Sequence, residues 1–214
     1  MAKTKTRAPY HHGNLREALV GAAVALIGEV GPHAFTLREV ARRAGVSHNA
    51  PYRHFASKDE LLAAVAAEGF ERLTAAMRKA MAPAKSARER LELCGCGYVE
   101  FALRWPHHLV VMFDLPSTWS RQRRKNQPIG EDAFGVLLDC VAETQHAGDL
   151  PAGDPLPLAW TAWSLVHGIA KLATGGNLPL SARATTVFAR GAAGAILRGL
   201  GAGSCSATES AEPA

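Results

Sequence analysis

The segment from Thr36 to Lys58 constrains the fold more than any other part of this 214-residue chain. Thr36 and Glu39 have the spacing of a capping box, in which two side chains satisfy backbone N–H groups at the start of a helix. Gly45 is placed to end that helix, because glycine readily adopts the left-handed conformation that follows a helix. Ser47 can then cap a second helix. The segment therefore predicts two short helices joined by a tight turn.

The two expected helices carry different side chains. The first has one apolar face at helical spacing, formed by Leu37, Val40, Ala41 and Ala44. The second, expected to run through Phe55, contains Pro51, which lacks a backbone N–H and is tolerated only in a first turn. We therefore expect it to begin near Ser47 or His48 and to be short. Its exposed first residues would include Asn49, and their small donors and acceptors suit base edges in a DNA major groove, as in a helix-turn-helix.

Both flanks of this segment also predict helices. Asn14 with Glu17 has the capping-box spacing, and it precedes an apolar helical face that ends at Gly31. Ser57 with Glu60 has the same spacing at the start of a long helix that reaches about residue 81. The N-terminal part of the chain is therefore expected to be a small three-helix unit followed by a long connecting helix.

Three stretches of this region resemble the TetR/AcrR family of bacterial transcriptional regulators. They are residues 36–41 (TLREVA), 45–47 (GVS) and 52–61 (YRHFASKDEL), and the similarity extends over about residues 11–73. The resemblance implies an all-α homodimer that represses its operator on double-stranded DNA until a small-molecule effector binds. Pro51 departs from the common family pattern, which has an aliphatic residue before the tyrosine.

The resemblance also implies which residues contact DNA. They are Thr36, Arg38, Ser47, His48, Asn49, Tyr52, His54 and Lys58. Phosphate contacts position a protein on DNA and base contacts specify sequence, so affinity would rest on Tyr52, His54 and Lys58, and specificity on His48 and Asn49. The alternatives are that Tyr52 packs in the small core and that His54 is a solvated surface residue.

Charge is segregated along the chain in the way that DNA binding requires. Residues 1–58 contain nine Lys and Arg against three Asp and Glu, whereas residues 59–214 contain fifteen against sixteen. A basic segment attracts the phosphate backbone. Residues 1–10 form a basic arm, which either reaches into an adjacent groove or is a flexible solvated tail.

The remainder of the chain predicts a second helical domain, so the fold class is all-α. We expect helices over residues 86–105, 106–113, 128–147, 155–174 and 181–200. The expected domains are a flexible arm (1–10), a helix-turn-helix domain (11–58), a connecting helix (59–82), a ligand-binding and dimerisation domain (83–200) and a disordered tail (201–214).

The second domain is the expected site of effector binding and dimerisation. Candidate pocket residues are Tyr98, Phe101, Trp105, His108, Met112, Phe113, Phe134, Trp163 and His167. Such an apolar pocket suits a hydrophobic or aromatic effector, although each residue could instead be ordinary core. Trp163, His167 and Gly168 resemble the C-terminal domain of a TetR subgroup marked by tryptophan, histidine and glycine. The resemblance places the dimer interface on the last two long helices, where small residues at 191–195 allow close approach.

We expect no enzymatic activity, no cofactor and no metal site. No P-loop, nucleophile elbow or HExxH motif is present. Cys94 and Cys96 would point to opposite sides of a helix, although either could sense redox state. The apolar stretch 156–173 is interrupted by His167 and Lys171, so we expect no membrane partner and a cytoplasmic location.

Two other functions stay open at this point. One is a small-molecule binding or sequestering protein whose DNA-binding head is vestigial. The other is an α-helical enzyme that uses His107, His108 or His167 with a cysteine. However, the sequence shows no base, nucleophile and orienting group at a spacing typical of a catalytic site. The basic run 121–125 is either a solvated loop or a second nucleic-acid contact.

Overall fold

The structure is a computed structural model, and it describes residues 15–114 and 133–202. Expectations for the arm 1–10, the Asn14 cap, the basic run 121–125, the helix start at 128–132 and the end of the tail fall outside these residues. Within the described ranges every regular element is a helix, so the all-α prediction is confirmed. None of these helices has the length and apolarity needed to span a membrane.

The chain divides into two compact units between Ala66 and Ala67. Unit 1 contains α1 (Leu15–Val30), α2 (Leu37–Arg43), the short 3-10 helix η2 (Pro51–Arg53) and the start of α3 (Lys58–Met81). Its buried apolar side chains come from all of these elements and include Leu19, Ala23, Leu26, Phe35, Val40, Phe55, Leu61 and Val65. The boundary lies inside the expected connecting helix 59–82, and the assignment of functional domains stays a prediction.

Two of the expected helix caps of unit 1, Thr36 and Ser57, are present, whereas the expected Ser47 cap is wrong because no side chain caps η2. The Glu39 N–H donates to Thr36 Oγ1 at 3.3 Å, and the Thr36 N–H donates to the Glu39 carboxylate at 2.7 Å, which completes the capping box. The Glu60 N–H donates to Ser57 Oγ at 3.2 Å. Gly45 has a φ of +71° after α2, a conformation that few other residues adopt.

The predicted helix over 47–55 is wrong in extent. The structure has a turn in which the Ala50 N–H donates to Ser47 O at 2.9 Å, followed by the single turn η2. Pro51 has no N–H to donate to Ser47, so it interrupts the α-helical hydrogen bonds at this point. The His54 N–H donates to Pro51 O at 2.9 Å, which keeps the segment in the tighter 3-10 conformation.

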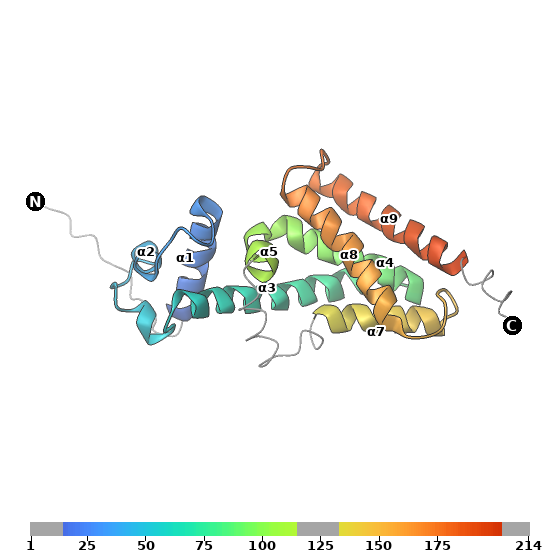
Figure 1. Ribbon diagram of the computed structural model, residues 1–214, viewed down its shortest axis with the longest axis horizontal. Coiled ribbons are helices and arrows are strands. Elements are labelled where there is room, and N and C mark those ends of the chain that lie inside the picture. The colour runs from blue at the N-terminus through green and yellow to red at the C-terminus, as the bar shows by residue number, and fades with distance from the viewer. Residues whose placement is uncertain (1–14, 115–132, 203–214) are drawn as a thin grey trace, which may run out of the picture. The chain divides into compact units, whose positions relative to one another are not determined.

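Unit 2 is built around α4 (Ala87–Arg104), which packs against α7 (Ala133–His146), α8 (Pro155–Thr174) and α9 (Ala182–Ala202). Figure 1 shows α8 crossing α4, with α9 running beside α8. The short helix α5 (Pro106–Phe113) follows α4, and residues 67–81 of α3 complete the unit. The predicted bounds of these helices are correct to within about two residues, wherever both ends are described.

Helices α3 and α4 approach each other closely at Gly97. A Cβ atom added to Gly97 would lie 2.7 Å from the Met77 Cα and 2.8 Å from the Ala76 carbonyl oxygen. Only a glycine fits at this distance, so backbone packs directly on backbone. This contact fixes the position of the middle of α4, which carries the side chains of the candidate ligand site described below.

Candidate functional site

The candidate DNA-binding surface of unit 1 is a short polar segment between α2 and α3. Ser47, His48, Asn49, Tyr52 and His54 are all exposed. Tyr52 is 52% exposed, so the alternative of a core position for Tyr52 is wrong. The side chains able to donate hydrogen bonds therefore stand free for a partner as large as a DNA duplex.

Two apolar residues hold this segment against the core of unit 1. Pro51 and Phe55 are buried, and the Phe55 N–H donates to Pro51 O at 2.9 Å. The Arg16 guanidinium of α1 lies 5.5 Å from the centre of the Phe55 ring. Because residues 51 and 55 face inward, the intervening Tyr52 and His54 are turned outward. The anchored proline thus replaces a regular helix as the support for the exposed residues.

Lys58 already has protein partners in this structure. Its Nζ donates to His33 O at 2.9 Å and to Phe35 O at 2.8 Å, and it lies 4.3 Å from the centre of the Phe35 ring. Partial burial lowers the pKa of Lys58. The ammonium group has three donors. Lys58 therefore ties the 33–35 loop to the start of α3, and one N–H remains for a further acceptor.

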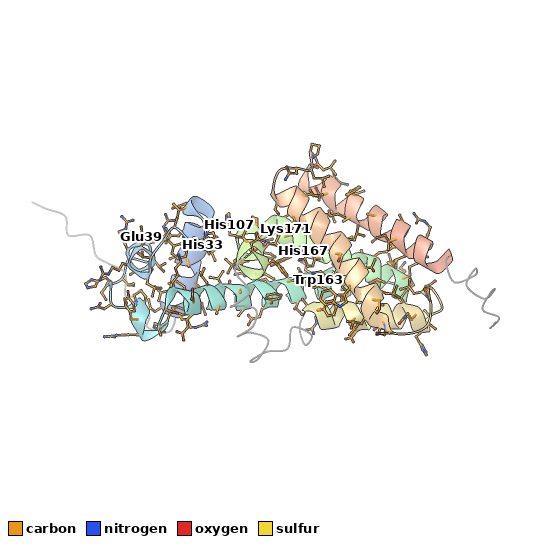
Figure 2. The ribbon with its side chains drawn as sticks, viewed as in Figure 1. His33, Glu39, His107, Trp163, His167 and Lys171 are labelled. Carbon is orange, nitrogen blue, oxygen red and sulfur yellow. The ribbon has the colours of Figure 1, made fainter. Side chains whose placement is uncertain are left out.

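The other two predicted DNA contacts lie on or beside α2. The Thr36 hydroxyl belongs to the capping box with Glu39, which Figure 2 labels, while Arg38 is exposed. The hydrogen bonds from Thr36 lower the pKa of the Glu39 carboxyl. Arg43 forms an ion pair with Glu29 of α1, so its charge is partly neutralised. Of these residues, Arg38 is the cation more available to an external anion.

Several aromatic side chains of unit 2 form one cluster around Trp163. Its ring centre lies 5.3 Å from Tyr98, 5.9 Å from Phe113 and 5.5 Å from Phe134, in edge-to-face arrangements. Phe113 also packs on His167 at 4.8 Å. Figure 2 shows Trp163 and His167 at successive turns of α8. Five of the nine predicted pocket residues are therefore brought together.

A polar pair lies within this aromatic cluster. The Tyr98 hydroxyl and His167 Nδ1 are 2.7 Å apart. Burial raises the pKa of Tyr98 above its usual range, so the phenol is neutral. Burial, with the nearby Lys171 ammonium, lowers the pKa of His167. Lys171 itself pairs with Asp114 at 2.6 Å. A neutral hydrogen-bonding pair in apolar surroundings can orient one polar group of a ligand.

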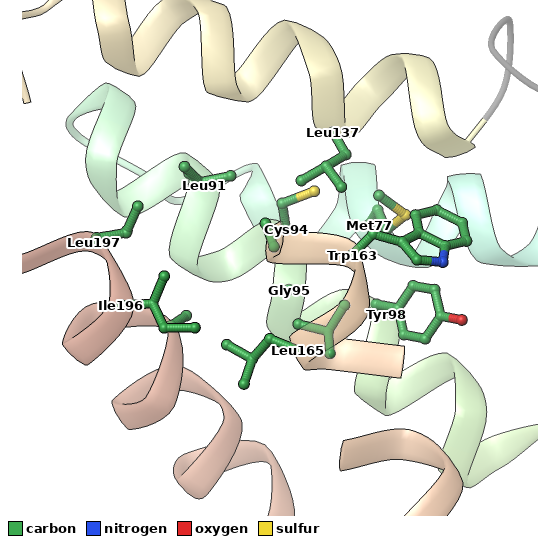
Figure 3. A pocket seen from close by; sticks show the side chains of 13 residues that line it. Met77, Leu91, Cys94, Gly95, Tyr98, Leu137, Trp163, Leu165, Ile196 and Leu197 are labelled. Carbon is green, nitrogen blue, oxygen red and sulfur yellow. The ribbon is translucent and has the colours of Figure 1, made fainter. Parts of the chain in front are cut away.

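A small enclosed space lies beside the cluster, among α3, α4, α7, α8 and α9. Its volume is about 30 Å³, and Figure 3 shows the side chains that line it. The lining residues are Met77, Leu91, Cys94, Gly95, Tyr98, Leu137, Ala162, Trp163, Leu165, Val166, Ala193, Ile196 and Leu197. Only Tyr98 and Trp163 of the predicted pocket residues belong to this lining. A space of this size holds about one or two waters, so a larger ligand requires the helices to separate.

The other predicted pocket residues lie elsewhere in unit 2. Phe101 is fully buried against Trp105, whose ring also contacts the guanidinium of Arg72 at 5.3 Å. Met112 and His108 pack on Gly69 of α3. Sequence reasoning missed the lining residues of α9, because their apolar spacing is that of any core helix. No cluster of three or more His, Cys, Asp or Glu occurs among the described residues.

Two family models match the chain. The model described as "Bacterial regulatory proteins, tetR family" matches residues 19–65, which lie in unit 1. The model described as "Tetracyclin repressor-like, C-terminal domain" matches residues 91–195 in unit 2. The narrower subgroup marked by tryptophan, histidine and glycine stays a prediction.

Curated relatives match over the N-terminal region. The HTH-type transcriptional regulator BetI of Rhizobium meliloti (strain 1021) is 41% identical over 76 residues, which are 36% of this chain and 37% of that protein. An HTH-type transcriptional repressor of Mycobacterium tuberculosis is 36% identical over 64 residues, 30% of this chain and 34% of that protein. The chain thus spans about a third of the length of these relatives.

One solved structure is similar over nearly the whole chain. A protein of unknown function from Rhodococcus sp. RHA1 is 35% identical, with a TM-score of 0.74, and the match covers 91% of this chain and 100% of that one. The likeness extends through both units. Together with family models for the N-terminal and C-terminal regions, it shows that the chain belongs to the tetR family of bacterial regulatory proteins.

Proposed function

We propose that this protein is a homodimeric transcriptional repressor that binds a palindromic DNA operator and is released by a small apolar or aromatic effector. The observation that carries the proposal is the exposed polar segment 47–54, which the buried side chains of Pro51 and Phe55 hold against the core of unit 1. It lies in the part of the chain with the excess of positive charge. Repression follows the name of the Mycobacterium tuberculosis relative, which matches this part of the chain.

The proposed DNA contacts of each residue follow from the exposure and the hydrogen-bonding groups of its side chain. Ser47, His48 and Asn49 supply donors and acceptors for base edges, and Tyr52 and His54 supply donors for phosphates. Arg38 adds a charge near the backbone, and Thr36 contacts the backbone from the start of α2. The third N–H of Lys58 completes the phosphate contacts, while the other two remain on the 33–35 loop.

Dimerisation is proposed to use α8 and α9. These helices contact each other, and both carry exposed large apolar side chains. The exposed residues are Leu156, Trp160, Leu172, Val187 and Phe188, with Val187 the most exposed at 67%. Not all of the small residues at 191–195 are available, because Ala193 lines the enclosed space and Gly194 is buried against Glu92. Gly191 and Ala195 are exposed and suit close approach of a second copy.

The effector is proposed to enter beside Tyr98 and Trp163. The lining is almost wholly apolar, and the Tyr98–His167 pair offers one polar contact. Because the space is about 30 Å³, a ligand of aromatic size separates α4 from α8 or α9 as it binds. Helix α3 contributes Met77 to the same lining and continues to Lys58, so its movement would change the separation of the two recognition segments. The effector must bind the released state more tightly than the DNA-bound state.

The test is selection of bound sequences from a random duplex pool at near-physiological salt. The expected result for the wild-type protein is an enriched palindrome. Tyr52→Ala should recover the same palindrome with about tenfold weaker affinity, as for loss of one hydrogen bond to a charged group. Asn49→Ala should change the recovered bases instead.

Val30→Ala is the matched control, because Val30 is also in unit 1 and is as exposed as Tyr52. It should leave both affinity and sequence unchanged. Selection of no sequence by a folded dimer would reject the proposal and leave a ligand-binding protein with a vestigial DNA head. An unchanged operator affinity in the presence of a ligand shown to bind beside Trp163 would reject release by that effector.

A further inference from the structure

The end of α5 places an aromatic ring and a carboxylate against one face of α8. The centre of the Phe113 ring lies 4.8 Å from that of His167 and 5.9 Å from that of Trp163. The next residue, Asp114, accepts a hydrogen bond from Lys171 Nζ at 2.6 Å. We propose that this face of α8 binds an aromatic carboxylic acid, and that Phe113 and Asp114 occupy the site as an internal ligand until the acid displaces them.

The chemistry of this face of α8 changes along the helix from aromatic to cationic. Trp163, His167 and Lys171 are successive residues at a spacing of four, so they share one face, as Figure 2 shows. Trp163 lines the enclosed space, whereas the Lys171 ammonium is partly exposed. A ligand bound along this face therefore places its ring inward against Trp163 and an anionic group outward at Lys171.

Two hydrogen-bond donors suit a carboxylate at this position. The ammonium of Lys171 is one of them. The other is His167, whose Nδ1 lies 2.7 Å from the Tyr98 hydroxyl. Because burial raises the pKa of Tyr98, the phenol keeps a proton to donate to Nδ1. A neutral imidazole that accepts at Nδ1 carries its own proton on Nε2, and this N–H can bind the second carboxylate oxygen of an acid.

The carboxylate of Asp114 is held in a way that allows its replacement. Asp114 is the C-cap residue of α5, where the negative end of the helix dipole disfavours a carboxylate. Lys171 offsets this repulsion, but both side chains are partly exposed, and ion pairs of that kind stabilise a fold only slightly. Exchange of Asp114 for the carboxylate of a ligand keeps Lys171 paired and returns Asp114 to water.

Displacement of Phe113 also provides room for the ligand. An apolar cavity of about 150 Å³ holds a benzene ring, whereas the enclosed space beside Trp163 has about 30 Å³. A departing Phe113 ring vacates a ring-sized space next to Trp163, so the helices need to separate less.

The same displacement reaches α3, because Phe113 packs edge-on against Phe70 of that helix, with 5.6 Å between ring centres. An acid that replaces Phe113 removes this contact. The inference rests on the proposed effector function and deepens it, since it names the class of effector and the part of the chain that the effector competes with.

The experiment compares cinnamate with cinnamamide, a neutral amide of nearly the same shape, by calorimetric titration of the full chain without DNA. Cinnamate should bind about tenfold more tightly, as for one hydrogen bond to a charged group. Lys171→Met keeps the aliphatic stem and should remove most of this preference. Asp114→Asn should raise the affinity for cinnamate by about two- to fivefold, because the competing carboxylate is gone. A merely structural ion pair would not give this increase.

Asp139→Asn is the matched control, because Asp139 is an exposed aspartate on α7 of the same unit. It removes the same charge and should leave both affinities unchanged. Phe113→Ala empties the aromatic position and should raise the affinities for cinnamate and cinnamamide alike. Circular dichroism confirms that each variant is folded, and Phe113→Leu replaces Phe113→Ala if the alanine variant unfolds.

The proposal is overturned if the wild-type protein does not bind cinnamate or binds cinnamamide equally well. It is also overturned if Asp114→Asn binds cinnamate no more tightly than the wild type does. Because binding is measured without DNA, a failure of operator recognition leaves this result untouched. Cinnamate that binds here and does not release the operator would reject the effector part of the proposed function and leave the site in place.

Discussion

Unit 1 and unit 2 hold their candidate functional residues in opposite ways. In unit 1, the residues at 47–54 are exposed and consecutive, and two buried neighbours support them. In unit 2, Tyr98 is buried, Trp163 and His167 are half-buried, and the three come from two helices that are distant in sequence. A surface for a large partner is built on top of a core, whereas a site for a small ligand is part of the core. We therefore expect substitutions at the exposed residues of unit 1 to change function without changing stability. Substitutions at the ligand site of unit 2 should change both.

The substitution with the largest expected effect on this comparison is Gly97→Ala in unit 2. The added Cβ would lie 2.7 Å from a backbone atom of α3, so the two helices must separate. Overpacking of this kind costs about 1–3 kcal/mol and sometimes more. All four tryptophans are in unit 2, so urea unfolding followed by tryptophan fluorescence measures the loss directly. The same variant should also lose effector binding beside Trp163.

Gly199→Ala is the matched control for that substitution. A Cβ at Gly199 meets no atom within 4 Å, and Gly199 also lies within a helix of unit 2, α9. Alanine favours a helix over glycine by about 1 kcal/mol, so this variant should be as stable as the wild type or slightly more stable. Equal stability of the two alanine variants would show that the close contact at Gly97 is not needed.

The next test is Lys58→Met in unit 1, which keeps the aliphatic stem and removes the ammonium. Two hydrogen bonds to the 33–35 loop are lost, and we expect unit 1 to be destabilised by about 1–2 kcal/mol, discounted for partial exposure. Hydrogen exchange of the peptides covering 33–66 should rise. Tryptophan fluorescence, which reports unit 2, should be unchanged.

Lys58→Met also separates the two roles of the residue. If its third N–H binds phosphate, the slope of log affinity against log salt should fall by about 1. Arg38→Met is the control for stability, because Arg38 is exposed and its loss should change unfolding by no more than about 0.5 kcal/mol. A stability loss with an unchanged salt slope would mean that Lys58 is a tether only.

The same contrast explains how far the sequence could predict this molecule. Helix caps such as Thr36 with Glu39 involve neighbours in sequence, so they were predictable, as was the exposed surface next to them. The extent of the 47–55 helix was not, because one proline outweighed the helical propensity around it. The pairing of Tyr98 with His167 depends on how α4 packs on α8, which no spacing encodes.

The smallest expected effect is a pH dependence, and it concerns a buried histidine that the sequence suggested as a pocket residue or, in the enzyme alternative, as a catalytic group. His108 is 4% exposed and neither ring nitrogen has a hydrogen-bond partner in the described part of the chain. Glu68 lies 3.9 Å away, which is too far for a hydrogen bond. Burial lowers the pKa of His108 below its usual 6.5, assisted by Arg72 and His107 and opposed by Glu68. The folded protein therefore binds a proton at this site less readily than the unfolded chain.

The sign of the pH effect follows from this shift. Between the unfolded pKa near 6.5 and the lower folded pKa, the unfolded chain binds more protons, so the stability of unit 2 falls as pH falls. One histidine contributes at most about 1.4 kcal/mol per pH unit, and the lowered pKa of His167 adds a second term of the same sign. His108→Leu should flatten the fluorescence-detected unfolding profile between pH 8 and 5. His146→Gln, at an exposed histidine elsewhere in unit 2, should leave it unchanged. A profile equally steep in both variants would place the titrating group elsewhere in unit 2.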